Sequence, residues 1–310
     1  MTGNRWRGVA GAATAMFCVG TLTGVSPDLH HYPVYGGQAL RYMAGAALLL
    51  MATRAAGLRR IRLSAREIML VAALAATGLA AFNVFIVEAT RYTSPATVAT
   101  IVATVPIILA LLGPLQVGRR PATRTVFGAV IVACGAAMAT GLGGGSPVGW
   151  LLALGALACE VSFSLLAVPL LPRLGAIRVS AYSTLTAVPL LLAAGLVVDG
   201  HGVLRVPTVT ETAALAYLAV VVTAIAFFCW YDALPRLGAE RAGLFSGFLP
   251  IGAAVSSLVL GTGRVGIGEL AGIVMVLSGL AVGFLAPSRP GPAAAPSVEP
   301  DQVPVAEVNR

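Results

Sequence analysis

The chain contains no lysine, and only 10% of its 310 residues are charged. A soluble domain carries about 25% charged residues, so this chain has too few polar side chains to cover a water-soluble globule. No lysine accompanies the twenty arginines, and all of these but Arg41 lie at or beyond the ends of apolar blocks. A nucleic-acid-binding domain would instead gather its basic residues on one face. The composition therefore favours a membrane protein and predicts no nucleic-acid partner.

Several motifs of enzymes and metal proteins are also missing. The four cysteines are scattered without CxxC spacing, which argues against a disulfide framework or a zinc site. The three histidines fall in predicted loops, and no Walker A, HExxH or GxSxG motif occurs. We therefore expect no enzymatic activity, no ATP hydrolysis, no metal and no cofactor.

Long apolar blocks dominate the chain, which is 58% hydrophobic with a mean hydropathy of +0.90. A membrane-spanning helix needs roughly 20 mostly apolar residues. Ten blocks of this kind occur: 8–26, 34–53, 67–89, 94–116, 123–141, 148–170, 180–199, 211–233, 240–262 and 268–286. The first could pass for a signal peptide, but nine further spans favour its being the first helix. The sequence predicts an all-α integral membrane protein with ten transmembrane helices.

The arginines indicate how these helices cross the membrane. With a cytoplasmic N-terminus, sixteen arginines lie in inner segments, whereas only Arg91, Arg205 and Arg264 lie in outer loops. Positive residues concentrate on the cytoplasmic side of membrane proteins. We predict a multi-pass protein of the plasma membrane with both termini in the cytoplasm. Residues 1–7 form the N-terminus, and the proline- and alanine-rich residues 287–310 form a disordered tail.

One stretch of the chain occurs twice. EATRYTSPATVATIVATVP begins at Glu88, and DALPRLGAERAGLFSGFLP begins at Asp232, 144 positions later. Both start with an acid followed by alanine, and Pro106 of the first matches Pro250 of the second. Glycines match at the same offset without a gap. The chain therefore contains an internal repeat.

Each repeat holds five predicted helices, within residues 8–141 and 148–286. Because five is an odd number, the second repeat enters the membrane upside down. Inverted repeats are common in transporters, whose substrate site lies between them near the middle of the membrane. We therefore predict two inverted five-helix repeats that form opposite walls of one pathway.

Pro106 and Pro250 fall near the centres of their predicted helices. Proline removes a backbone donor and clashes with the preceding turn, so it bends the helix and frees a carbonyl. In a membrane that carbonyl needs a neighbour or a water-filled cavity. We interpret both prolines as bends that line the cavity or hinge the halves; a simple packing kink is the alternative.

Two blocks carry a resemblance to a known family. AFNVFIVEATRYTSPATVATIVATVPIILALLGPLQVG and AFFCWYDALPRLGAERAGLFSGFLPIGAAVSSLVLG resemble the central stretch of each repeat in EamA-type transporters of the drug/metabolite transporter superfamily. GGQALRYMAGAALLLM resembles the second helix of that family, and the likeness spans residues 8–286. The resemblance implies ten helices in two inverted repeats. It also implies movement of small organic solutes, often outward and often coupled to protons.

Glu160 lies in the middle of the sixth predicted helix. A charge inside a membrane is costly unless it is paired, hydrated or neutralised, so such a residue is a functional candidate. A carboxyl that binds a proton in one state and a cationic group in another could couple transport. A structural hydrogen bond between helices is the alternative.

Arg41 and Tyr42 lie early in the second predicted helix. Arg41 could bind an anionic group of the substrate, pair with Glu160, or extend toward the outer interface. Asn83, deep in the third predicted helix, is a candidate for lining the cavity. We group Glu160, Arg41, Asn83 and Tyr42 as candidates for substrate binding and proton coupling.

Glu88 and Asp232 lie at equivalent positions near helix ends. Arg91 follows Glu88 by three residues and Arg236 follows Asp232 by four, spacings that allow ion pairs along a helix. We interpret them as paired charges at the membrane interface. Tyr92, Trp230 and Tyr231 lie nearby, as expected for an aromatic belt. Gly128, Gly135, Gly272, Gly279 and Gly283 are expected to let the fifth and tenth helices pack closely.

Together these patterns favour a secondary transporter of a small organic metabolite or amphipathic drug, an exporter working by alternating access with proton coupling. Its partners would be the solute, the lipid bilayer and protons, and a homodimer is left open. One alternative is a membrane scaffold or receptor without transport, which would need no Glu160. The other is an intramembrane enzyme, which lacks a recognisable catalytic motif.

Overall fold

The computed structural model describes residues 3–58, 61–141, 143–261 and 265–284. Within these ranges the chain forms helices and no strand. The elements in chain order are α1 Gly3–Gly20, α2 Leu22–Val25, η1 Ser26–Leu29, α3 Val34–Ala55, α4 Ala65–Leu74, η2 Ala75–Ala81, α5 Phe82–Tyr92, α6 Pro95–Val102, α7 Val105–Gln116, α8 Thr123–Thr140, α9 Pro147–Leu165, α10 Leu171–Val198, η3 Gly200–Val203, α11 Val209–Tyr217, η4 Leu218–Ile225, α12 Ala226–Leu237, α13 Ala239–Ala242, η5 Gly243–Gly247, α14 Phe248–Val259 and α15 Ile267–Phe284. The predicted disordered tail, 287–310, lies outside the described residues.

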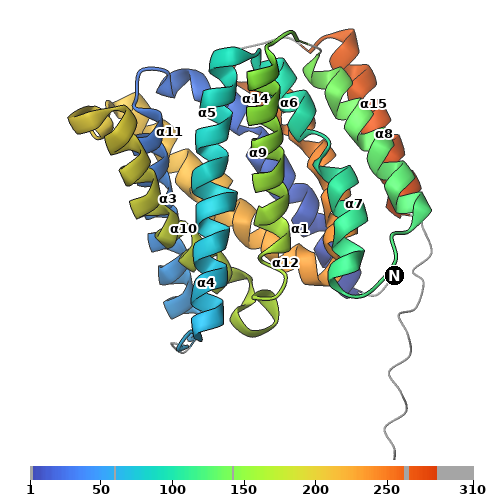
Figure 1. The fold of residues 1–310 in the computed structure, drawn as a ribbon, viewed down its shortest axis with the longest axis horizontal. Coiled ribbons are helices and arrows are strands. Elements are labelled where there is room, and N and C mark those ends of the chain that lie inside the picture. Colours follow the sequence, from blue (N-terminus) through green and yellow to red (C-terminus); the bar gives the residue numbers. More distant parts are fainter. Residues whose placement is uncertain (1–2, 59–60, 142, 262–264, 285–310) are drawn as a thin grey trace, which may run out of the picture.

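Nine segments of the described chain are long and apolar enough to cross a membrane. They are Gly3–Leu29, Ala65–Tyr92, Pro95–Gln116, Thr123–Thr140, Pro147–Leu165, Leu171–Val198, Val209–Leu237, Ala239–Val259 and Ile267–Phe284. The predicted second span forms the 22-residue helix α3 but is not among them. Its glycines together with Gln38 and Arg41 lower its mean hydropathy. The helices form an upright bundle (Figure 1).

The third and eighth predicted spans share an unusual construction. Each begins at a capping box, Ser64 with Glu67 and Thr208 with Glu211, in which side chain and backbone satisfy each other's free groups. Each then passes through a π-helix, η2 or η4, before resuming as an α-helix. Thr208 lies 144 positions after Ser64, the offset of the sequence repeat. The two spans are therefore built alike from cap to π-helix.

The proline-containing spans are interrupted ahead of the proline. The fourth predicted span breaks into α6 and α7 at a turn, and Pro106 is the second residue of α7. The ninth begins as α13 and the 3-10 helix η5, and Pro250 is the third residue of α14. The sixth predicted helix, 148–170, ends earlier than expected, at Leu165 of α9.

Helices α8 and α15 lie side by side and run antiparallel (Figure 1). A Cβ built on Gly128 would lie 2.5 Å from the Cα of Gly283, and one on Gly272 would lie 2.5 Å from the carbonyl oxygen of Gly135. Only hydrogen at these positions allows the two backbones to approach so closely. The expected glycine-mediated packing of the fifth and tenth helices is confirmed.

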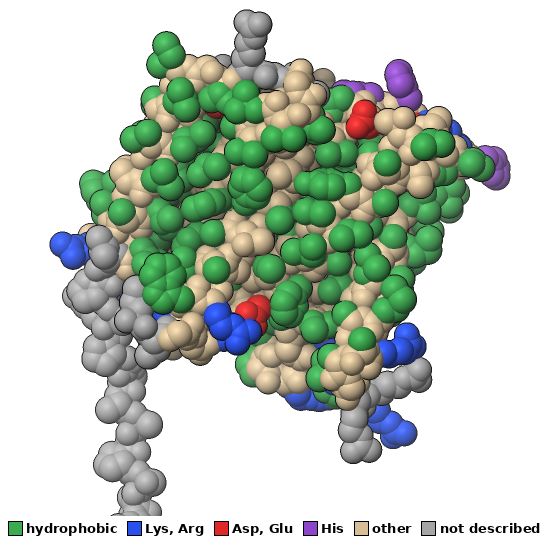
Figure 2. All heavy atoms as spheres, turned by 180° about the vertical axis from the view of Figure 1, so that it is seen from behind, with side chains coloured by type: hydrophobic (Ala, Val, Ile, Leu, Met, Phe, Trp, Pro, Cys, Tyr) green, Lys and Arg blue, Asp and Glu red, His purple; other side chains and the backbone are tan. Residues whose placement is uncertain are grey.

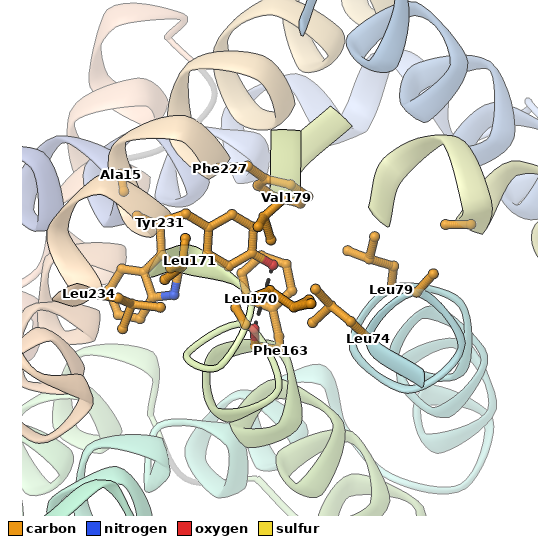
Figure 3. Close-up of a cluster of buried hydrophobic side chains, with 14 of the residues drawn as sticks. Ala15, Leu74, Leu79, Phe163, Leu170, Leu171, Val179, Phe227, Tyr231 and Leu234 are labelled. Atoms are coloured by element: carbon orange, nitrogen blue, oxygen red, sulfur yellow. Dashed lines mark hydrogen bonds between the residues drawn. The ribbon is translucent and has the colours of Figure 1, made fainter. Parts of the chain in front are cut away.

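An aromatic cluster forms part of the main core. Phe163 of α9 lies between Phe227 and Tyr231 of α12, with ring centroids 4.9 and 5.1 Å apart. The Tyr231 hydroxyl donates to the carbonyl oxygen of Phe163 (Figure 3). Trp230 donates through Nε1 to the Ser164 hydroxyl at 3.2 Å. The expectation of an aromatic belt is wrong for Trp230 and Tyr231, because α12 lies in the interior and buries both side chains.

The outer surface matches a bilayer environment. In the space-filling view hydrophobic side chains cover the middle of the face shown, whereas arginines gather near its lower end (Figure 2). We call this end, where α4 begins, the Glu67 end. The opposite end, where α5 ends and α6 begins, is the Pro95 end. The fold is that of a multi-pass membrane protein.

Candidate functional site

A central cavity of about 490 Å³ lies between the helices of the two halves of the chain. Both sequence repeats contribute to its walls, which come from α1, α2, α3, η2, α5, α6, α7, α8, α9, α12, η5 and α14. Most of the lining is apolar, including Val98, Val102, Phe163, Phe227 and Leu249. A cavity of this size and character suits a small solute with a substantial apolar part.

The cavity extends toward the Pro95 end. Its lining includes Thr90 and Pro95 at the end of α5 and the start of α6, and Thr140 at the end of α8. Toward the Glu67 end its lining includes Phe163 and Trp230, which belong to the buried aromatic cluster. The cavity therefore reaches the Pro95 end of the bundle, and packed side chains separate it from the Glu67 end.

Ion pairs connect the two halves at the Glu67 end. Arg173, just inside α10, binds Glu67 of α4 at 2.9 Å and also donates to the carbonyl oxygen of Arg62. Arg119, after α7, binds Glu240 of α13 at 2.9 Å. Each pair joins a residue of the first repeat to one of the second. These ion pairs hold the two halves together between the cavity and the Glu67 end.

Glu160, on α9, lines the central cavity and is partly buried. Within the described chain, no hydrogen bond or ion pair to its carboxyl is formed. The alternative expectation of a structural hydrogen bond between helices is therefore not met. An unpaired carboxyl facing a cavity is available to bind a proton or a cationic group.

Arg41, on α3, is only 6% exposed and also lines the central cavity. Its Nε donates to the Thr223 hydroxyl at 2.7 Å, and its two terminal nitrogens donate to Gln38 Oε1 at 3.1 Å and the Val222 carbonyl oxygen at 3.3 Å. Among the described residues it makes no ion pair within 4.0 Å, Glu160 included. The expected pair with Glu160 is therefore not formed, and the side chain is held against η4.

Asn83 and Tyr42 meet at the cavity wall. Asn83 Nδ2 donates to the carbonyl oxygen of Leu79 at 2.7 Å and lies 3.5 Å from the Tyr42 hydroxyl. Leu79 belongs to the π-helix η2, so the Asn83 amide satisfies a carbonyl at this irregular turn. The structure thus brings all four candidates, Glu160, Arg41, Asn83 and Tyr42, to the lining of one cavity.

A second hollow, which we call the side cavity, has a volume of about 260 Å³. It lies beside η1 and the start of α3, with Tyr32 and His30 in its wall. It shares Leu22, Gln38 and Arg41 with the central cavity. Arg41 and Gln38 therefore stand where the two hollows meet.

The remaining candidates lie apart from these hollows, except for one proline. Pro250 lines the central cavity, whereas Pro106 is buried outside its lining. Glu88 binds Arg91 at 3.3 Å near the Pro95 end, and Asp232 binds Arg236 at 2.7 Å near the Glu67 end. Within the described ranges, no cluster of three or more His, Cys, Asp or Glu side chains could hold a metal ion.

Sequence reasoning missed several residues at the site. The pairs of Glu67 with Arg173 and of Arg119 with Glu240 join positions more than a hundred residues apart, which no local pattern reveals. A signal for Glu67 was present, because the capping-box pattern SARE marks the start of a helix. Thr223 carried no signal, since its importance depends on the contact with Arg41.

The fold and the cavity define a helical membrane protein with a solute-sized cavity between two halves. The profile of the EamA-like transporter family matches residues 6–141 and 147–285. The chain belongs to the EamA-like transporter family. Membership implies a small-molecule substrate and a lipid environment, and members of the family are transporters rather than enzymes.

Two curated proteins are similar over most of their length. The "Uncharacterized transporter YetK" of Bacillus subtilis is 25% identical over 286 residues, which cover 90% of this chain and 87% of that protein. The "Probable terminal-alkyne amino-acid exporter" of Streptantibioticus cattleyicolor is 27% identical over 261 residues, covering 80% and 85%. A solved crystal structure superposes on this chain with a TM-score of 0.75 at 20% sequence identity. The match covers 90% of this chain and 97% of the other chain, and it supports the fold.

Proposed function

We propose that the chain is a secondary transporter that exports a small organic metabolite or amphipathic drug by alternating access with proton coupling. The central cavity carries this proposal. Residues of both halves line it, and they include the unpaired carboxyl of Glu160. At the Glu67 end, ion pairs join the two halves and close the cavity. A scaffold or receptor would have no use for this combination.

The proposal includes two inverted five-helix repeats, residues 8–141 and 148–286. In it α3 also crosses the membrane, as the second span in chain order, and brings the number of spans to ten. Equivalent residues at the 144-position offset support it, because they lie at opposite ends of the bundle. The Glu88–Arg91 pair is near the Pro95 end, whereas the Asp232–Arg236 pair is near the Glu67 end. The antiparallel packing of α8 against its counterpart α15 agrees with a half-turn between the repeats.

We place the Glu67 end in the cytoplasm of the cell, because arginines gather there. Both termini are then cytoplasmic and the central cavity faces outward. In the transport cycle the halves would rock about the site, closing the Pro95 end and opening the Glu67 end. The helix breaks next to Pro106 and Pro250 are the positions at which such bending would be concentrated.

Glu160 would couple this movement to protons. In the outward-facing state its carboxyl exchanges the solute's cationic group for a proton from outside. In the inward-facing state it releases the proton and binds solute again. Net outward movement of solute then accompanies inward movement of protons. A relative named as an exporter supports this direction.

The test uses the purified full chain in liposomes under an imposed pH gradient, with a panel of amphipathic amines, carboxylates and amino acids. We expect the protein to drive at least one solute against its concentration gradient. Glu160→Gln should retain downhill exchange and lose the pH-driven accumulation. Glu269→Gln is the matched control, because Glu269 lies at the start of α15 outside the cavity. No movement beyond protein-free liposomes, or full coupling in Glu160→Gln, would contradict the proposal.

A further inference from the structure

Arg41 is a buried cation whose hydrogen bonds all go to uncharged oxygens. Each of the five ion pairs found in the described chain gives an arginine a carboxylate partner. Arg41 is in none of them, although it is more deeply buried than any of those arginines. A buried charge is stable only when it is compensated. The arrangement leaves a positive charge at the cavity wall for an anion to neutralise.

The guanidinium group also has donors to spare. It carries five N–H groups, of which the bonds to Thr223, Gln38 and Val222 use three. The residue lines both the central and the side cavity, so an anion could approach it from either. A guanidinium binds a carboxylate through two parallel hydrogen bonds, which matches the number of donors left.

The surroundings hold Arg41 in one position. Gly45, one turn along α3, lies so close to η4 that a Cβ there would be 2.7 Å from Thr223 Cγ2. Thr223 and Val222 belong to this π-helix, whose irregular hydrogen bonding leaves backbone groups available to side chains. The hydroxyl of Thr223 and the amide of Gln38 therefore act as positioning groups. They orient the guanidinium without neutralising it.

We propose that Arg41 binds the carboxylate of an amphipathic solute that carries one carboxylate as well as the cationic group that Glu160 would bind, and whose apolar part lies in the central cavity. Thr223 and Gln38 are positioning residues for this site. One carboxylate balances the single charge of Arg41, whereas a phosphate dianion would bring excess negative charge into an apolar cavity. This inference rests on the proposed function, because it names the solute class for the same cavity.

The experiment measures binding of phenylacetate and of phenylacetamide to the full chain in detergent by titration calorimetry. The two probes share a shape and differ in charge. A charge-assisted hydrogen bond contributes about 1.5–3 kcal/mol, so wild type should prefer the acid by roughly tenfold or more. Arg41→Gln should bind both probes equally. Thr223→Val should lose several-fold of the preference, and Thr223→Ser, which keeps the hydroxyl, should restore it.

Binding of the amide reports on folding, because a misfolded variant would lose both probes. The inference is overturned if wild type shows no preference for the acid, or if Arg41→Gln keeps it. The positioning role of Thr223 is overturned if Thr223→Val keeps the full preference. Failure here leaves the proposed function standing when liposomes still transport other solutes. Conversely, acid-selective binding without transport would retain the anion site and remove the proposed function.

Discussion

Glu160 and Arg41 are two charged residues inside apolar helices, and their surroundings in the structure differ. Both line the central cavity, but Glu160 has no partner within the described chain, whereas Arg41 makes three hydrogen bonds. A carboxyl without fixed partners can change its protonation or its ligand during a cycle. A guanidinium held by neutral groups keeps its charge in place. The two residues are therefore suited to coupling and to recognition, respectively.

The hydrogen bond between Trp230 and Ser164 can be tested directly, because both residues are buried. Trp230→Phe leaves the Ser164 hydroxyl without its donor and removes part of a ring. We expect it to reduce the free energy of unfolding in detergent by about 1–3 kcal/mol. Adding Ser164→Ala should recover part of that loss, because no unpaired hydroxyl then remains. Strictly additive losses in the double variant would mean that the bond contributes nothing.

The helices themselves were largely predictable. Nine of the ten apolar blocks coincide with segments of the described chain that are long and apolar enough to cross a membrane, and the other block forms α3. Caps such as Ser64 explain where helices begin. Interruptions within the spans were not predicted, because the π-helices η2 and η4 contain ordinary apolar residues whose irregularity depends on packing. The four candidate residues of the cavity were found because polar groups are rare in apolar blocks. Their partners were not, since Thr223 and Leu79 look unremarkable in sequence.

Close contact between α8 and α15 makes glycine essential at particular turns. A Cβ at Gly272 would lie 2.5 Å from the Gly135 carbonyl oxygen, whereas one at Gly268, a turn earlier, would meet only the Met138 carbonyl oxygen at 3.9 Å. Gly272→Ala should lower stability in detergent by about 1–3 kcal/mol, because overpacking forces the helices apart. Gly268→Ala should leave thermal unfolding unchanged or slightly raise its midpoint. Equal melting of the two variants would contradict this packing.

The ion pair of Arg119 with Glu240 should influence the transport rate. Arg119→Glu places two carboxylates together at the Glu67 end. Their repulsion weakens the contact between the two halves that closes this end of the cavity. Because Arg119 is 40% exposed, we expect a modest effect of about 1 kcal/mol, equivalent to a few-fold change in solute exchange by liposomes. The exchanged pair, Arg119→Glu with Glu240→Arg, should return the rate toward wild type. Arg124→Glu, an exposed arginine at the same end, is the control.

If the exchanged pair is as impaired as Arg119→Glu alone, the ion pair has no part in the cycle. An equal effect of Arg124→Glu would point instead to the general charge of that surface. Both outcomes would leave the cavity intact and would change only the account of how it is closed.

In the whole molecule, two halves of one chain enclose a cavity that neither half could form alone. The repeat in the sequence predicted that both halves of the chain would line one pathway, and residues of both halves do line the central cavity. Which end is open could not be predicted, since it depends on contacts such as that of Glu67 with Arg173. In the structure the central cavity reaches the Pro95 end, and an ion pair joins the two halves at the Glu67 end.

The central claim is that solute passes through this cavity. We would replace the four native cysteines and introduce Ala99→Cys, which lies in the cavity wall near the Pro95 end. A bulky, membrane-impermeant maleimide added outside intact cells should react there and stop solute efflux. Gly144→Cys, a loop position where a Cβ meets nothing within 4 Å, should react without losing efflux. Continued efflux after complete labelling of Ala99→Cys would contradict the account.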